Sequence, residues 1–458
     1  MVGRTATSTI IDWITSTGFG DLPEDVRKIA QLAAYDGVGC ILACSMLPVA
    51  HRLFQFIRLA GGGSECSVIG FPQRTSALSA ALVNGTLGHA DEVDAIDDFN
   101  TRGSHVLAAC LAAALTAGQL ARAPGRETLR GVVLGYEVSK RAHAQAAQAK
   151  REGAPAFVPF DEGNTLGAAV AAGVALRLNP DQLQVAISLG GHLACGITPF
   201  RREAHHMTKS FTRGGMGAKN GITAALMAKA DYDAPRDIFD GRESFFDSYL
   251  GVSEPGPEFL AGLGEEFSIR GLIFKRNSSG GGLQAPRQAL LEMIAEHGLS
   301  SVDIEGIKVE MRPGDIDSYF SSHRHPADCG DALALAALYG GMGFKEAHQE
   351  RYTSSPEFQD MRPRVVVQPR QDWNDASYRL HTAVTVTTRD GRSFRQETDY
   401  RHMTEADLMD KFSYLVGLRI GQPKAEELSV LLKNLAEAPD VAEVMAQLEF
   451  TEADIEQI

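Results

Sequence analysis

Apolar residues recur at helical spacing through the first 265 residues, and small residues dominate several of these segments. The clearest are 22–44, 75–90, 104–121, 164–178, 181–197 and 217–230. Small side chains let helices pack closely, as they also do in membranes, but Asp, Arg, Lys and Gly interrupt every segment. We therefore predict a compact, all-helical domain over residues 1–265.

The pattern changes near residue 266. Residues 268–275, 303–313 and 362–370 are typical of strands, and 381–400 is typical of a β-hairpin with "RDGR" at its turn. Helical segments lie between them, which predicts a smaller α+β domain over 266–400. Thr404 then begins a helical tail, which we expect to complete the first domain over 401–458. The predicted fold class is mainly α, with an α+β second domain.

Composition and charge narrow the class of protein. The chain has 458 residues, a net charge of −14 and no tract rich in lysine or arginine, which argues against nucleic-acid binding. The six cysteines form no CxxC pair and have mostly apolar neighbours, which suits buried thiols in a reducing compartment. The N-terminus lacks the apolar core of a signal peptide, and no run is long enough to span a membrane. We expect a cytoplasmic enzyme, with a binding or scaffold protein as the alternative.

The stretch "GHADEVDAIDDFNTRGSH", residues 88–105, holds five carboxylates between His89 and His105. It is open to three interpretations: a metal site, an acid/base site, or a solvated loop. No HxxxH or HExxH spacing supports a metal site. Turn-forming residues favour a loop around Asp97 and Asp98. The charged cluster directly follows an apolar predicted helix, which favours a functional site with shifted pKa values.

Three further segments carry basic or polar groups. Residues 205–221 combine His205, His206, Lys209 and Arg213 with a glycine-rich helix entry, which is typical of an anion site. In residues 271–284, Lys275 and Arg276 end a predicted strand before a Ser/Gly loop, and this segment could hold a carboxylate. Residues 321–331 contain His323, Arg324 and His325 close together, a pattern that fits a polar loop as well as it fits a functional site. No nucleotide-binding motif is present.

These pieces, in this order, resemble the MmgE/PrpD family, which includes 2-methylcitrate dehydratase, cis-aconitate decarboxylase and iminodisuccinate epimerase. The resemblance covers nearly the whole chain and rests on an ordered series of segments. They are "AAYDGVGCILAC", "NGTLGHADEVD", "SHVLAACLAAAL", "GYEVSKR", "GNTLGAAVAAGVALRL", "TKSFTRGGMGAKNGITAALMA", "IFDGRESFF", "DIEGIKVEM" and "HPADCGDALALAALYGG". The resemblance implies a helical domain with an α+β lid, a homodimer, a site in the cleft between the domains, and chemistry without a metal or organic cofactor.

The resemblance also assigns site residues. The family's acidic segment falls on Glu92 and Asp94, with Ala95 and Ile96 where a further Asp and a Thr are usual. The resulting catalytic candidates are Glu92, Asp94, His105, Lys209 and Lys275. The substrate-binding candidates are His89, Arg213, Arg276 and Ser278, and no residue is assigned to a metal.

The chain departs from the family pattern at several positions. Val158 stands where a site histidine is usual, and Gly280 and Gln284 replace a Cys and a His. The expected second-domain Tyr falls on Asp331 or Ala332. We therefore predict a metal-independent lyase or isomerase that abstracts a proton next to a carboxylate of a small di- or tricarboxylate, with a modest tilt toward isomerisation or an atypical lyase. The alternative is an altered family member that binds a carboxylate without turnover.

Overall fold

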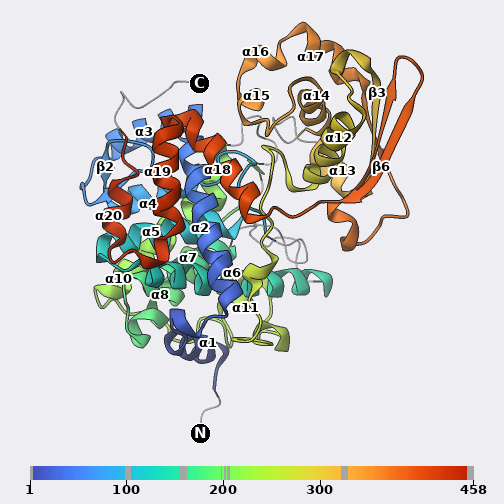
Figure 1. Cartoon of the computed structure of the whole chain (residues 1–458). Coiled ribbons are helices and arrows are strands. Elements are labelled where there is room, and N and C mark those ends of the chain that lie inside the picture. The colour runs from blue at the N-terminus through green and yellow to red at the C-terminus, as the bar shows by residue number, and fades with distance from the viewer. Residues whose placement is uncertain are drawn as a thin grey trace.

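The computed structural model describes residues 4–97, 105–153, 162–197, 199–200, 203, 207–320 and 328–450. Figure 1 shows a large helical body and a smaller α+β body beside one end of it. The N-terminal and C-terminal segments both belong to the helical body. The α+β body is therefore formed by an internal part of the chain.

Alanine-rich helices pack around α7 in the helical body, where α7 contacts α5, α6, α8 and α10. These small, fully buried residues let the helix axes approach closely, which confirms the helices predicted from the apolar pattern. Its helices are α1 (Ala6–Ser16), α2 (Glu24–Cys44), α3 (Pro48–Ala60), α4 (Ala77–Leu87), α5 (Val106–Ala121), α6 (Gly125–Arg151), α7 (Glu162–Ala175), α8 (Pro180–Leu193), α9 (Met207–Ser210), α10 (Gly217–Lys229) and α11 (Phe245–Leu250). A short antiparallel pair, β1 (Cys66–Ser67) and β2 (Arg74–Thr75), lies between α3 and α4.

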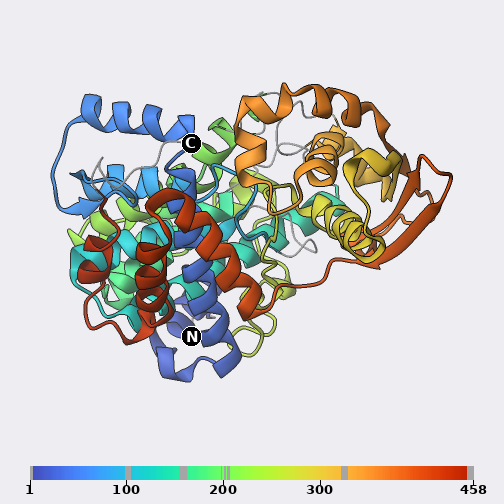
Figure 2. The same cartoon turned by 45° about the horizontal axis from the view of Figure 1, so that its top comes forward.

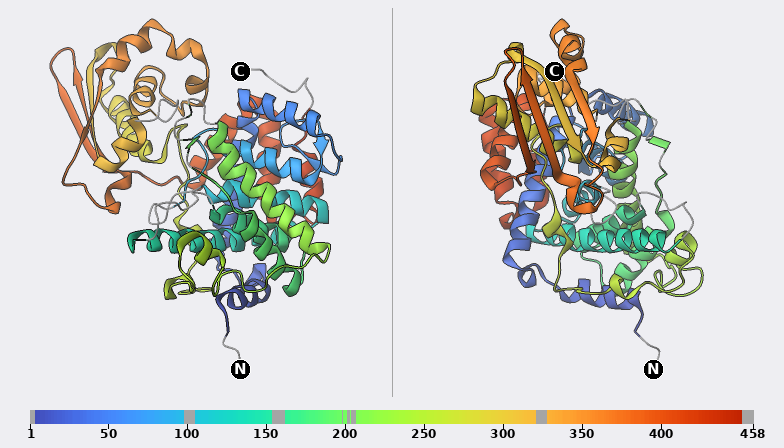
Figure 3. Two further views of the ribbon diagram at one scale, coloured as in Figure 1. Left: turned by 180° about the vertical axis from the view of Figure 1, so that it is seen from behind. Right: turned by 90° about the vertical axis from the view of Figure 1, so that its right-hand side faces the viewer.

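The second body is a four-stranded sheet in the order β4-β3-β5-β6, with β3 and β4 parallel and the other pairs antiparallel. The strands are β3 (Ile304–Met311), β4 (Val365–Pro369), β5 (His381–Thr388) and β6 (Ser393–Asp399). The helices are α12 (Gln284–His297), α13 (Pro313–Phe320), α14 (Cys329–Tyr339), α15 (Phe344–His348), α16 (Glu350–Thr353) and α17 (Pro356–Met361). Helices α12 and α14 pack on the sheet, whose strands run side by side in Figure 3. The predicted strands at 303–313 and 362–370 and the hairpin are confirmed.

The strand predicted at 268–275 is wrong. Residues Ser268–Gly271 form a 3-10 turn, and Ile273 makes only an isolated antiparallel bridge with Ile96. This apolar run is the connection between the two bodies. Leu272 packs in the helical core and Ile273 in a small separate cluster, so the apolar residues serve packing rather than a sheet.

The C-terminal helices pack back on the helical body beside α2 (Figure 2). They are α18 (Glu405–Ile420), α19 (Gln422–Lys433) and α20 (Val441–Ala446). Thr404 caps α18 in a capping box with Asp407, as predicted. Phe412 of α18 stacks on Tyr35 of α2, with ring centroids 4.3 Å apart.

The predicted fold class, a helical domain with a smaller α+β domain, is confirmed. The predicted domain boundaries at 265–266 and 400–401 stay a prediction. Within the described ranges no single helix has the length and apolar composition to cross a bilayer, and only α2 and α3 together, bent by 85°, reach them. Five cysteines are buried as expected, but Cys195 is exposed, which corrects the expectation for that thiol.

Candidate active site

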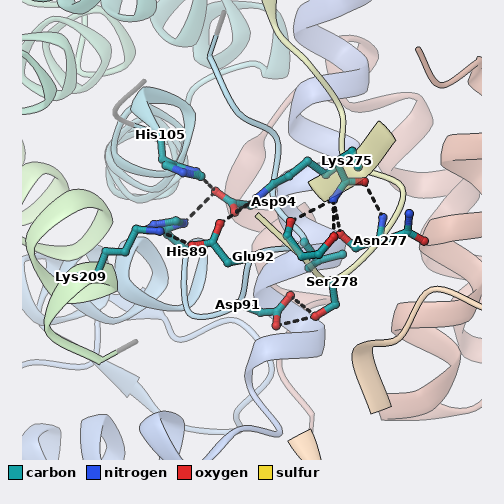
Figure 4. A network of polar contacts seen from close by, with 12 residues as sticks. His89, Asp91, Glu92, Asp94, His105, Lys209, Lys275, Asn277 and Ser278 are labelled. Atoms are coloured by element: carbon teal, nitrogen blue, oxygen red, sulfur yellow. Dashed lines mark hydrogen bonds and ion pairs between the residues drawn. The ribbon is translucent and has the colours of Figure 1, made fainter. Parts of the chain in front are cut away.

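The acidic segment, defined here as residues 88–97, lies where the two bodies meet. It leaves the end of α4 through a tight turn, in which the His89 N–H donates to the Thr86 carbonyl. At its other end Ile96 pairs with Ile273 through two main-chain hydrogen bonds of 2.9 Å. Figure 4 shows Glu92 and Asp94 of this segment beside lysines from two distant parts of the chain, while Asp91 points toward Ser278.

Glu92 lies between two lysines. One carboxylate oxygen accepts from the Lys275 ammonium at 3.1 Å, and the other pairs with Lys209 of α9. The side chain of Lys275 is 0% exposed and that of Glu92 is 5% exposed. Three of the predicted catalytic residues, from three distant parts of the chain, therefore form one buried charge cluster.

Asp94 binds two histidines through the same carboxylate oxygen. The Nδ1 atoms of His105 and His89 lie 2.7 and 3.1 Å from its Oδ2, and the two rings are tilted by 32° with centroids 3.8 Å apart. Its other oxygen lies 3.5 Å from the Lys275 Nζ, which joins this triad to the Glu92 cluster. His105 precedes α5 in the left-handed conformation (φ 55°, ψ 47°), which is uncommon for a non-glycine residue.

The two lysines differ in their pKa values. Burial lowers the pKa of Lys209 from 10.5 to about 8, because Glu92 only partly offsets the desolvation and Arg213 and Lys275 add repulsion. Burial would also lower the pKa of Lys275, but the charges of Glu92 and Asp94 outweigh it and raise that pKa. Near neutral pH, Lys275 is a fixed cation and Lys209 can lose a proton.

In the histidine–aspartate triad the acid is ionised and the two bases are neutral. Burial opposes ionisation of Asp94, yet His105, His89 and Lys275 hold its pKa well below the usual value. Burial lowers the pKa of both histidines. Asp94 is therefore a carboxylate that accepts an Nδ1–H from each neutral ring, which places the acceptor lone pair of each ring on Nε2.

His89, Asp94 and His105 are also the group within the described ranges whose ligand atoms could hold a metal ion, since those atoms lie within 4.8 Å of one another. Two features oppose this use. The Asp94 oxygen that binds both rings is already shared, and Lys275 and Lys209 place positive charge beside the triad. The geometry fits acid/base chemistry better than divalent-cation binding.

A π-helix positions Lys209 and Arg213. Helix α9 continues through residues Phe211–Met216 as a π-helix into α10. The glycine-rich part of 205–221 therefore lies within a continuous helical run, and the prediction that it is the entry to a helix is wrong. Gly214 lies against the main chain of α4, where a Cβ on Gly214 would be 1.9 Å from the Gly85 carbonyl oxygen. This contact holds the lysine-bearing helix close to the helix that ends at the acidic segment. His205 and His206 lie outside the described residues.

We expect Gly214→Ala to reduce turnover about 100-fold, because the added methyl group forces the π-helix away from α4 and displaces Lys209 in the adjoining α9. Overpacking of this kind costs about 1–3 kcal/mol of stability. Steady-state kinetics and thermal melting measure both effects. Gly20→Ala is the control, since a Cβ on Gly20 meets nothing within 4 Å. A Gly214→Ala protein with wild-type turnover would remove the packing argument.

The predicted substrate-binding residues have different surroundings. Ser278 is 0% exposed, and its hydroxyl donates to the Asp91 carboxylate, which also binds the His348 Nε2 at 2.6 Å. Arg213 is 6% exposed, and its charge reaches both Lys209 and His105. Arg276 instead pairs with Asp407 of α18 at 2.8 Å. The roles of these residues in substrate binding stay predictions.

The prediction that Asp97 lies in a solvated loop is wrong. Its side chain is 0% exposed, accepts from the Tyr136 hydroxyl at 2.8 Å and lies 4.0 Å from the Lys140 ammonium. Both partners come from the "GYEVSKR" segment of α6. Asp98 lies outside the described residues.

Three positions that depart from the family pattern, all among the described residues, each have a structural role. Gln284 accepts from the N–H groups of Arg276 and Asn277 and donates to the Ser279 carbonyl, so it shapes the loop after Lys275. Gly280 is buried and precedes the 3-10 turn of residues Gly281–Leu283, which leads into α12. Asp331 forms an ion pair with Arg362 at 2.5 Å. Val158 and residues 321–327 lie outside the described residues.

Sequence reasoning did not find His348, Lys411 or Asp36, which contact the acidic segment or hold a residue that does. Their local sequence carries no motif, and they lie far from the segment along the chain. Only Asp36 had a signal in the sequence: it lies in the family-like segment "AAYDGVGC", which does not indicate its partner Lys411.

Comparison with known proteins agrees with this architecture. Residues 8–258 match the MmgE/PrpD N-terminal domain, and residues 278–437 match the MmgE/PrpD C-terminal domain. The chain is 26% identical over 293 residues to a cis-aconitate decarboxylase of Aspergillus terreus, a match that covers 58% of this chain and 56% of that protein. It is 25% identical over 303 residues to the cis-aconitate decarboxylase-like protein oryM of Aspergillus oryzae, covering 62% of this chain and 60% of that protein. The matches thus span less than two thirds of either relative. The two domain matches together show that the chain belongs to the MmgE/PrpD family.

Proposed function

We propose that the protein is a lyase or isomerase that abstracts a proton next to a carboxylate of a small di- or tricarboxylate. The observation that carries this proposal is the pair of lysines flanking Glu92, one with its pKa lowered to about 8 and the other with its pKa raised. A permanent cation beside a titratable amine is the arrangement that carbanion chemistry needs.

The chemistry follows from these charges. The neutral Lys209 amine accepts the proton from the carbon, and the electron pair of the broken C–H bond moves onto the adjacent carboxylate as an enolate. Lys275 supplies positive charge where that negative charge develops. His105, oriented by Asp94, is placed to exchange a proton with the intermediate or a leaving group. In this scheme Lys275 takes the role that a metal ion would otherwise have.

The relatives support the substrate class. Two of them are named as cis-aconitate decarboxylase or a protein like it. Loss of CO2 from such a molecule leaves electrons on carbon, as proton abstraction does, so one cationic site can serve either step. The choice among dehydration, decarboxylation and epimerisation is part of the proposal's test.

The test is proton exchange followed by NMR. The protein is incubated in D2O with 2-methylcitrate, citrate, cis-aconitate or iminodisuccinate, and the signals of the protons next to the carboxylates are monitored. We expect exchange, or conversion to a product, with at least one of them. Binding measured by calorimetry without exchange or conversion would favour the non-catalytic alternative. If the protein neither binds nor exchanges protons of any of these compounds, the proposed substrate class is rejected.

The proposal predicts how activity depends on pH. Because the neutral amine is the base, kcat/KM should rise about tenfold per pH unit up to the Lys209 pKa of about 8 and level off above it. His105 as the base would place this rise below pH 6.5, since burial lowers its pKa from that value. A pH–rate profile of the active substrate distinguishes the two. A rise confined to pH values below 6.5 would assign the base to His105.

A further inference from the structure

A buried lysine of the C-terminal helices contacts the acidic segment at a main-chain atom. Lys411 of α18 is 0% exposed, and its ammonium donates to the Val93 carbonyl at 2.7 Å. The same ammonium pairs with Asp36 of α2 at 2.7 Å. Val93 separates the two carboxylates that bind the lysines and histidines of the site.

We propose that Lys411 and Asp36 are positioning residues, which hold Glu92 and Asp94 in the geometry that catalysis requires. The inference deepens the proposed function and rests on it. Lys411 acts through the main chain of the acidic segment, at the Val93 carbonyl, and Asp36 acts through Lys411.

The acidic segment needs such support because its middle has no regular secondary structure. Residues 91–95 are in neither helix nor strand. One end is held by the last turn of α4 and the other by the pairing of Ile96 with Ile273. Lys411 holds the middle of the segment by donating to the Val93 carbonyl. Loss of this donor from a buried carbonyl costs free energy of folding.

The charges make this contact persistent. Burial would lower the pKa of Lys411, but Asp36 outweighs it and raises that pKa, so the ammonium keeps its protons. Charged donors form the shorter and stronger hydrogen bonds. Asp36, 4% exposed, lies in α2, and its carboxylate binds the same ammonium. Three segments, around residues 36, 93 and 411, thus meet at one nitrogen.

The test uses a double variant, Asp36→Asn/Lys411→Met, beside the single variant Lys411→Met. The single variant leaves the Asp36 carboxylate buried and unpaired, so it is expected to be destabilised. The double variant removes both charges and keeps the side-chain volumes similar, so it is expected to fold. Arg419→Met is the matched control. Arg419 lies two turns further along α18, is 1% exposed, and also donates to a main-chain carbonyl, that of Gly70.

For the double variant we expect kcat to fall about 100-fold with KM nearly unchanged, as misplacement of catalytic groups predicts. Arg419→Met should retain the wild-type kcat. Hydrogen–deuterium exchange should accelerate in peptides covering 91–97 of the double variant and stay unchanged in α7. A double variant with wild-type kcat and exchange, or an equal loss of kcat in Arg419→Met, would overturn the positioning role.

The two proposals can fail separately. If the wild-type protein acts on none of the carboxylates, the proposed function fails. Hydrogen exchange in 91–97 still decides the positioning role, because it is measured without substrate. If the wild-type protein is active and the double variant is equally active, the positioning role fails alone.

Discussion

Replacing Glu92 by glutamine should reduce turnover by about 1000-fold or more. The carboxylate accepts from Lys275 at 3.1 Å and pairs with Lys209, and both lysines are held in place by its negative charge. A neutral amide removes the counter-ion that the two ammonium groups share, which lowers both lysine pKa values and leaves Asp94 as the carboxylate beside Lys275. The cation that the intermediate needs is weakened and both lysines lose the contact that positions them. Steady-state kinetics measures this loss, and thermal melting should show a cost of about 3–5 kcal/mol.

Glu137→Gln is the matched control for this prediction. Glu137 is also a buried glutamate, and it pairs with Arg141 at 2.8 Å, away from the two lysines. Its replacement should cost stability while most of the turnover remains. Glu92→Asp keeps the charge on a shorter side chain and should retain more turnover than Glu92→Gln. A Glu92→Gln protein within tenfold of wild-type turnover would exclude the proposed charge arrangement.

Replacing Lys275 by alanine or methionine should abolish measurable turnover. Lys275 is 0% exposed, and its ammonium lies beside both carboxylates, 3.1 Å from Glu92 and 3.5 Å from Asp94. Without it, Asp94 loses one of the charges that hold its pKa low. The enolate also loses its electrostatic stabilisation, worth about 3–4 kcal/mol for one strong donor. Methionine fills the volume of the lysine stem, so Lys275→Met separates the loss of charge from the loss of packing.

The decisive measurement for Lys275 is proton exchange by a variant that is still folded. Circular dichroism and thermal melting establish the fold, with Arg419→Met as a variant of similar burial outside the site. Deuterium exchange of the active substrate should fall to the background rate in Lys275→Met. Exchange at the wild-type rate would assign the cation to another residue.

Local patterns predicted most of the fold. The alternating residues of 303–313 and the turn of the hairpin lead to β3, β5 and β6, because strand periodicity and turn chemistry act over a few residues. The run 268–275 misled because apolar residues also serve a connection between two cores. Periodicity does not record which core a residue enters.

The site was predictable only where a motif marks it. The family resemblance pointed to Glu92, Asp94, Lys209 and Lys275, which the structure brings into one cluster. The burial of Asp97 depends on Tyr136 and Lys140 from α6, and turn propensity carries no information about such partners. His348 and Lys411 carry no sequence signal for the same reason, since each contacts the acidic segment through one long-range hydrogen bond.

The contact between Lys411 and Val93 joins residues 318 positions apart, and this has a consequence for biosynthesis. At ribosomal rates of about 5–20 residues per second, Lys411 is made about 15–60 s after the acidic segment. Until then α2 lacks the C-terminal helix that covers Tyr35, and Asp36 is without its counter-ion. The nascent helical body therefore waits with an apolar face uncovered, and this interval is when chaperones and aggregation compete for the chain.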